Sequence, residues 1–295
     1  MAIKRYTANK DNTITNAFGM DLATRATGSN MGASDILEVF SIFGQQQTTS
    51  SAATGSVELS RVLVEFPIST ISSNRTANLI PASGSVNFYL RMFNARHSEQ
   101  LAKDITVNVM AISQSWQEGT GLDMVSYKDT TRDSIDGSNW TNRERSSTWG
   151  KPGGEYHSSS YTAGQTMPNY TFTFTDGYED LELDITSMVE EWLSGKHQNY
   201  GVGVFLTSDF EGYVSNSSGQ DSSVLIHNPD GAKRSYYTKK FFSRSSEFFY
   251  KKPLIEARWD SRITDDRGNF YASSSIAPGA DNLNNLYLYN YIRGR

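Results

Sequence analysis

The 295-residue chain contains no cysteine. This absence excludes disulfide bonds, thiolate zinc sites and cysteine nucleophiles, and it fits folding in a reducing compartment. The chain also lacks any apolar run near the about 18 residues that a membrane-spanning helix needs, and its first residues lack the apolar stretch of a signal peptide. We therefore expect a soluble protein with no membrane partner and no visible export signal.

Concentrated positive charge is also missing. The formal net charge is −5, and the 27 Lys and Arg residues are scattered along the chain. A surface that binds nucleic acid needs a basic patch, so nucleic acid is not an expected partner. Hydrophobic residues make up 37% of the chain, which is sufficient for one large β domain.

Motifs of catalysis are absent as well. The histidines His97, His157, His197 and His227 show no metal-ligand spacing, and the chain has neither a G-x-S-x-G turn nor a phosphate-binding G-x-x-x-x-G-K-S/T loop. We therefore expect no enzyme activity. The alternative of a glycosidase stays open, because two carboxylates from distant segments leave no sequence signature.

The chain does contain short strand-like runs separated by turns. These runs alternate apolar and polar residues or are rich in β-branched and aromatic residues, and the loops between them are rich in glycine and serine. Runs of this number and size predict an all-β antiparallel sandwich. They span residues 35–44, 60–68, 85–93, 104–113, 170–176, 181–185, 202–206, 223–228, 236–242 and 253–259.

Residues 180–206 change their hydrophobic period twice. Up to Ile185 apolar and acidic residues alternate, as in a strand with one wet face. From Ser187 to Leu193 apolar residues recur at helical spacing, and a strand pattern then returns. Because two turns of helix are too short to be stable alone, we expect Trp192 to be buried and the helix to close one end of the sandwich.

The ends of this helix carry capping signals. Ser187 and Glu190 have the spacing of a capping box, and Gly195 is placed to end the helix. Glu190 and Glu191 are expected on the solvent-facing side, where carboxylates are seldom catalytic.

The polar stretch 117–166 carries two candidate binding residues, Trp140 and Trp149. Exposed indoles there would stack on a sugar ring, contact another subunit, or anchor the long loop onto the sandwich, and we favour loop anchoring. The other tryptophans lie on strand or helix patterns and are expected in the core: Trp116, Trp192 and Trp259.

The same stretch offers oxygen ligands for calcium. Asp129, Asp133, Asp136 and Asn139 lie close together in the sequence, and Ca²⁺ favours clustered carboxylate and carbonyl oxygens. Their spacing is not that of an EF-hand, and the Asp-Gly pair that begins at Asp136 is equally a turn signal. We favour an ordinary solvated turn, and we expect no cofactor other than this candidate Ca²⁺.

The order of motifs resembles a known family. The runs "RVLVEF", "VNFYLRMF", "ITVNVMAISQSWQEG", "DLELDITSMVEEWLSGKHQNYGVGVFL", "FFSRSSEF" and "PLIEARW" are similar to the DNRLRE-type β-sandwich domain, a jelly-roll module related to carbohydrate-binding modules. The resemblance spans Lys4 to Trp259. Its most specific part is the series Asp184, Thr186, Trp192, Asn199 and Gly201.

This resemblance implies a jelly-roll sandwich domain over residues 1–262. The usual module passes quickly from its "SW-E" strand to the next strand, whereas the stretch 117–166 intervenes in this chain. Because loops on a rigid scaffold commonly carry binding groups, we expect any individual function to reside in this insertion.

Residues 263–295 differ in composition and are interpreted as an extended C-terminal arm. They contain few aliphatic residues until "NLYLYNYIRGR", where aromatic residues crowd together. The whole chain resembles virion structural proteins of marine tailed bacteriophages, particularly those that infect cyanobacteria. The resemblance implies a non-enzymatic component of the head, neck or tail. Its localisation is then the virion, assembled in the host cytoplasm, and its partners are copies of itself and other virion proteins.

The arm is the expected assembly contact. In an extended strand, Leu286 and Leu288 point to one side and Tyr287, Tyr289 and Tyr291 to the other. Such a strand would aggregate if exposed, so we expect it to add to or pack against a neighbouring subunit, with folding back onto its own domain as the alternative. The alternative function is a carbohydrate-binding module of a surface or secreted protein, with a glycan as partner.

Overall fold

The computed structural model describes residues 1–19, 23–46, 54–96, 103–122, 137–157, 167–214, 225–234 and 236–261. Antiparallel strands dominate these residues and form two main sheets with a small hairpin beside them. The all-β antiparallel sandwich expected from the sequence is therefore confirmed.

The smaller sheet has four strands in the order β1-β13-β5-β10, and every pair is antiparallel. Ala2 lies opposite Trp259, so the first residues of the chain and the last described strand end side by side. The four strands are β1 (Ala2–Thr7), β13 (Leu254–Trp259), β5 (Asn87–Met92) and β10 (Leu181–Asp184).

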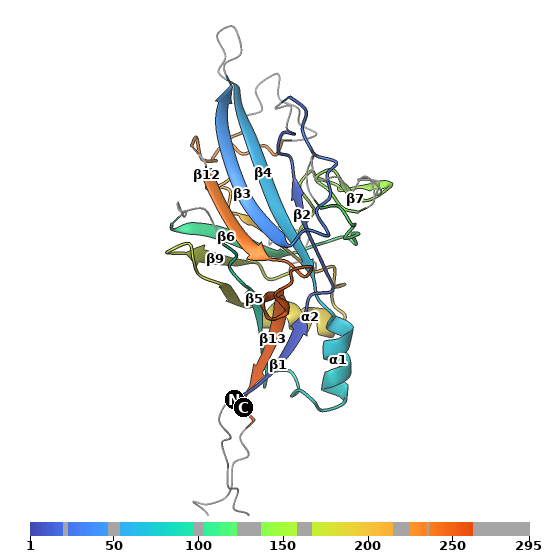
Figure 1. Ribbon diagram of the computed structural model, residues 1–295. Helices are drawn as coiled ribbons and strands as arrows, with labels where there is room; N and C mark the ends of the chain where they lie inside the picture. The colour runs from blue at the N-terminus through green and yellow to red at the C-terminus, as the bar shows by residue number, and fades with distance from the viewer. Residues whose placement is uncertain are drawn as a thin grey trace, which may run out of the picture.

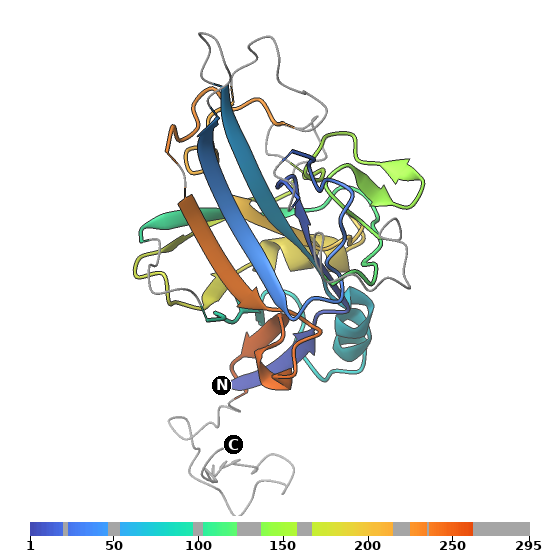
Figure 2. The ribbon, with the colours of Figure 1, turned by 45° about the horizontal axis from the view of Figure 1, so that its top comes forward.

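The larger sheet has seven strands in the order β12-β3-β4-β11-β6-β9, with β2 also paired to β4. Figures 1 and 2 show β12, β3 and β4 running side by side as long strands. The strands are β2 (Lys10–Thr15), β3 (Ile36–Gln46), β4 (Thr54–Glu65), β6 (Ile105–Ala111), β9 (Tyr170–Phe174), β11 (Val202–Leu206) and β12 (Tyr236–Phe242).

The main hydrophobic core lies between the two sheets. Because side chains alternate along a strand, alternate residues of several strands of both sheets contribute to it. Phe88 and Leu90 of β5 and Val62 and Val64 of β4 are fully buried there. Two helices, α1 (Ile68–Thr76) and α2 (Thr186–Leu193), pack against each other beside this core and add buried side chains to it.

The short helix expected near residue 187 is α2, and its Trp192 is buried as predicted. The predicted capping box is wrong. The helix begins at Thr186, so Ser187 lies inside the first turn and caps nothing. Asp184 accepts hydrogen bonds from the Thr186 backbone N–H and hydroxyl instead, at 2.9 and 2.5 Å. Gly195 does follow the last turn, at φ +75°.

The prediction that Glu190 and Glu191 face solvent is also wrong. The Glu190 carboxylate accepts hydrogen bonds from the Arg75 guanidinium of α1 at 2.6 and 2.8 Å, which ties the two helices together. Glu191 lies 3.1 Å from the Lys196 ammonium and 3.2 Å from Nε2 of His197. Both carboxylates are thus partly buried and paired. The partner of Glu190 could not be foreseen, because α1 has no recognisable sequence pattern.

Several elements differ from the expected set. Strands β1 and β2, helix α1, the 3₁₀ turn η1 (Phe249–Lys251) and the hairpin of β7 (Asn142–Glu144) and β8 (Ser147–Thr148) were not predicted. The strand predicted at 223–228 is wrong for its described residues, where Asn228 forms only an isolated bridge with Val214. The remaining nine predicted runs each match a strand.

Candidate functional site

The described residues of the stretch 117–166, which we call the insertion, pack over the outer face of the seven-stranded sheet and build a second hydrophobic core there. Leu59 and Leu63 of β4 point into this second core, while Val62 and Val64 point into the first, so β4 is buried on both faces. In Figures 1 and 2 the hairpin of the insertion lies beside β2. The second core consists of Ile14, Val57, Leu59, Leu63, Ile112, Trp116, Trp140, Trp149 and Val214.

Trp140 and Trp149 are the anchors of this layer. Their exposed fractions are 0% and 5%, and Nε1 of Trp149 donates a hydrogen bond to the Asn139 carbonyl at 2.9 Å. The structure therefore places both indoles in the loop-anchoring role. The exposed ring faces that sugar stacking requires are not present at these two residues. Trp116 is buried as expected, whereas Trp259 is only half-buried.

A buried ion pair lies beside the second core. The Arg61 guanidinium on β4 contacts both carboxylate oxygens of Glu211, with Nη2 at 2.9 and 3.0 Å and Nε at 3.2 Å. Its Nη1 donates to the Gly153 carbonyl at 3.2 Å. The guanidinium carbon also lies 4.6 Å from the Phe205 ring centroid and 5.8 Å from that of Tyr156.

Tyr156 completes this arrangement. Burial raises the pKa of its phenol to about 12, and the nearby Arg61 opposes the shift only in part. The phenol is therefore protonated at neutral pH and donates a hydrogen bond to the Gly153 carbonyl at 2.9 Å. Sequence reasoning missed this cluster, because Arg61 and Glu211 are 150 residues apart. Arg61 and Glu211 satisfy each other, and both Arg61 and the partly buried Tyr156 bind the Gly153 carbonyl, so the cluster fastens the insertion to β4.

A second buried cation fastens the two sheets together. Lys239 of β12 is 1% exposed, and its ammonium donates to Oδ1 of Asn94 and to the carbonyls of Gly177 and Glu179, each at 2.8 Å. Burial lowers the pKa of Lys239 to about 8, although nearby carboxylates oppose this shift. The lysine thus links β12, the end of β5 and the turn between β9 and β10.

Of the four predicted calcium ligands, the structure describes Asn139 alone. Asp129, Asp133 and Asp136 lie outside the described residues. Asn139 is described, and its Oδ1 accepts hydrogen bonds from Thr141 and from the Asn142 backbone N–H, which is the geometry of a turn. Within the described ranges no three acidic or histidine side chains gather as a metal site would require.

The most specific motif residues of the sequence hold the backbone together. Nδ2 of Asn199 donates to the Phe66 carbonyl at 2.8 Å, and its Oδ1 accepts from the Gly201 N–H at 3.0 Å. Gly201 has φ +85°, and a Cβ there would lie 2.0 Å from the Val64 carbonyl oxygen. Thr186 accepts a hydrogen bond from the Phe88 N–H at 2.8 Å. These contacts give the motif a structural role.

Two of these motif residues, Trp192 and Asn199, also line a hollow of about 380 Å³ between the start of α1 and the end of α2. Polar residues form part of its wall, including Glu65 and Gln198. The indole Nε1 of Trp192 is buried without a hydrogen-bond partner. Because that atom has almost no accessible surface, the hollow offers a ligand little access to it.

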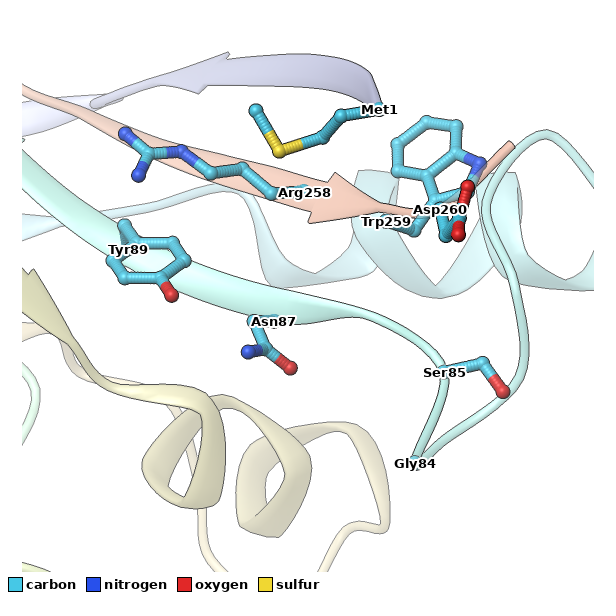
Figure 3. Close-up of a pocket in the computed structure, with 8 residues that line it drawn as sticks. All are labelled: Met1, Gly84, Ser85, Asn87, Tyr89, Arg258, Trp259 and Asp260. Atoms are coloured by element: carbon cyan, nitrogen blue, oxygen red, sulfur yellow. The ribbon is translucent and has the colours of Figure 1, made fainter. Parts of the chain in front are cut away.

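A larger open groove of about 700 Å³ lies at the end of the four-stranded sheet. Figure 3 shows Tyr89 and Asn87 on β5 facing Arg258 and Trp259 on β13. The Arg258 guanidinium lies 4.2 Å from the Tyr89 ring centroid and is held by carboxylates of the same sheet face. The groove is lined by Met1, Gly84, Ser85, Asn87, Tyr89, Arg258, Trp259 and Asp260.

The groove adjoins the point where the described chain ends. Trp259 and Asp260 form part of its wall. The residues predicted to form the assembly arm, Leu286, Tyr287, Leu288, Tyr289 and Tyr291, follow in the sequence and lie outside the described part. Large apolar side chains are exposed at the same edge, with Met1 77% and Ile3 45% accessible. No sequence pattern indicates this groove, because its wall combines both ends of the described chain with β5.

A second exposed surface surrounds η1. Phe249 and Tyr250 are largely exposed, and their rings are perpendicular at 5.6 Å between centroids. Phe248 joins them and contacts Phe242 at 5.3 Å. Such clusters of exposed aromatic side chains are typical of protein interfaces.

Comparisons of the chain with protein-family models and with curated proteins find no match. Of the helices described, none combines the length and the apolar character that crossing a membrane requires.

Proposed function

We infer that the chain is a non-enzymatic structural component of a tailed phage virion, and that it assembles through its sandwich surface and C-terminal arm. The observation that carries this proposal is the open groove at the end of the four-stranded sheet. The described chain ends beside this groove, the arm follows in the sequence, and exposed Met1 and Ile3 lie at the same edge. An aromatic arm that starts there can reach a neighbouring subunit, since extended chain spans up to about 3.3 Å per residue.

The placement of polar clusters supports a structural role. The buried Arg61–Glu211 pair and the partly buried Tyr156 lie within a packed layer, and none of the three lines the open groove. A catalytic cluster would instead line a cavity that a substrate can enter. The alternative of a carbohydrate-binding module loses its expected stacking residues, because Trp140 and Trp149 are buried.

Removal of residues 283–295 tests the assembly role. The truncated chain is expected to keep the melting temperature of the full chain, because both described hydrophobic cores are built from residues between Tyr6 and Trp259. It is also expected to give a smaller mass in size-exclusion light scattering. A matched variant with Tyr287, Tyr289 and Tyr291 replaced by serine retains the length of the arm and should lose assembly to a similar degree.

Two outcomes would contradict the assembly proposal. One is unfolding of the truncated chain, which would make the arm part of the core. The other is an unchanged assembled mass, which would place the contact on another surface. The virion assignment is tested separately by mass spectrometry of purified phage particles, where the chain should appear at a fixed stoichiometry. If the protein is absent from purified particles of a phage whose genome encodes it, the virion assignment is rejected.

A further inference from the structure

Three distant segments meet at a buried carboxylate. Asp11, on β2, is 1% exposed, and its side chain accepts a short hydrogen bond from the backbone N–H of Arg244 in the turn after β12. The Asp11 N–H donates to Oε1 of Glu118 at 2.9 Å. The Arg244 guanidinium contacts both Glu118 oxygens, from Nε at 3.0 Å and Nη2 at 2.7 Å. Glu118 stands at the start of the insertion.

The charges of this joint are not balanced locally. The Arg244 guanidinium binds the Glu118 carboxylate, whereas the Asp11 carboxylate accepts its hydrogen bond from the Arg244 backbone N–H. Burial raises the pKa of Asp11 to about 7. The Glu118 charge raises it further, whereas the Arg244 N–H and the charges of Arg244 and Lys252 oppose the rise. Asp11 thus exchanges its proton near neutrality, where an ordinary aspartate is fully ionised.

Strand β2 contacts the insertion at two points, Glu118 and Ser138, which we call its two stems. Asp11 holds Glu118 on one side, and Nδ2 of the adjacent Asn12 donates to the Ser138 carbonyl at 2.8 Å on the other. Asn30 bridges the stems, because its Nδ2 donates to the carbonyls of both Glu118 and Ser138, at 2.7 and 2.8 Å. Packing is tight enough that a Cβ on Gly32 would lie 2.2 Å from the Glu118 carbonyl oxygen. Displacement of Glu118 therefore disturbs both stems.

We propose that the Asp11–Glu118–Arg244 joint is a pH-sensitive clasp that holds the insertion on the sandwich while Asp11 is protonated and loosens it when Asp11 ionises. Ionisation of Asp11 places a second negative charge beside Glu118 in a buried site. Separation of the insertion from β2 relieves the repulsion, because it admits water to the two carboxylates. The pKa of Asp11 is raised in the closed state, so the stabilisation is complete below about pH 4 and is lost as pH rises through about 7. This inference is independent of the proposed virion function.

Hydrogen exchange of the full chain tests the clasp. Protection of residues 137–157, a described part of the insertion, is compared at about pH 6 and about pH 8 after correction for base-catalysed chemical exchange, with β11 as the internal reference. With a closed-state pKa near 7 and an ordinary value in the open state, protection of the insertion should fall about tenfold relative to β11. The Asp11→Asn variant should show no such fall. The control Asp209→Asn, which alters an exposed carboxylate, should behave as the unmodified chain.

A second variant keeps the test decisive if Asp11→Asn does not fold. Glu118→Gln removes the charge that raises the pKa of Asp11, so the midpoint of the protection change should move to lower pH. The clasp is rejected if the unmodified insertion loses no more protection than β11. It is also rejected if Asp11→Asn keeps the fall, or if the midpoint of Glu118→Gln stays in place or rises.

Discussion

Replacement of Arg61 by methionine should strongly destabilise the protein. Arg61 and Glu211 are each about 8% exposed, and the guanidinium is the only cation that contacts Glu211 in the described ion pairs. Removing it leaves an uncompensated buried carboxylate, which typically costs about 3–5 kcal/mol. The Gly153 carbonyl loses a donor and the Phe205 ring loses its cation contact, so a value in the upper half of this range is expected.

Urea unfolding, followed by circular dichroism and by tryptophan fluorescence, measures this loss. The double variant Arg61→Met/Glu211→Gln should recover part of the stability, because no buried charge is left unpaired. Arg5→Met is the matched control. Arg5 also pairs with a carboxylate, that of Glu256 at 2.8 Å, but its side chain is 66% exposed. Loss of this surface partner should cost less than about 1 kcal/mol.

The reasoning would be refuted by a small loss. If Arg61→Met costs no more than Arg5→Met, the buried pair does not anchor the insertion. If the double variant is as unstable as Arg61→Met alone, the cost comes from packing and not from the unpaired charge of Glu211. Either result would assign the attachment of the insertion to its tryptophans instead.

Two further predictions concern other buried groups. Trp192→Ala should cost about 3–5 kcal/mol in urea unfolding, as truncation of a buried aromatic side chain does, and a loss below about 0.5 kcal/mol would show that α2 does not close the core. For Lys239, the pKa is about 8 in the fold and 10.5 is the ordinary value, so the unfolded chain binds more protons between these pH values. The stability of the unmodified protein relative to Lys239→Met should therefore rise from about pH 8 to about pH 10, by up to about 1.4 kcal/mol per unit, and a flat difference would contradict the lowered pKa.

Local periodicity identified most strands and one helix. The alternation of Leu181, Leu183 and Ile185 predicts β10, and helical spacing around Trp192 predicts α2 with its buried face. These patterns are visible because they depend only on which side of an element faces the core. The same reasoning missed α1, whose buried residues are only Ile68 and Ile71, because most of its positions are polar and the helix depends on packing against α2.

Strands β1 and β2 illustrate a second limit. Their charged and amide residues interrupt any apolar alternation, and the sequence "KDNTIT" of β2 is buried almost throughout. Asp11 and Asn12 are tolerated inside the protein because Glu118, Arg244 and Ser138 satisfy them from more than 100 residues away. No local sequence pattern indicates such distant partners, so β1 and β2 can be identified only from the tertiary structure.

The sequence by itself determined the all-β class, the positions of most strands and the burial of Trp192, because these follow from side-chain periodicity. It also marked the polar stretch 117–166, with Trp140 and Trp149 in it, as a separate segment between strand-like runs. The tertiary structure alone decided that this insertion forms a second core, and that Arg61 and Glu211 meet within it. Those features depend on which strands pair and in what register, and pairing over such distances is set by the whole packed chain.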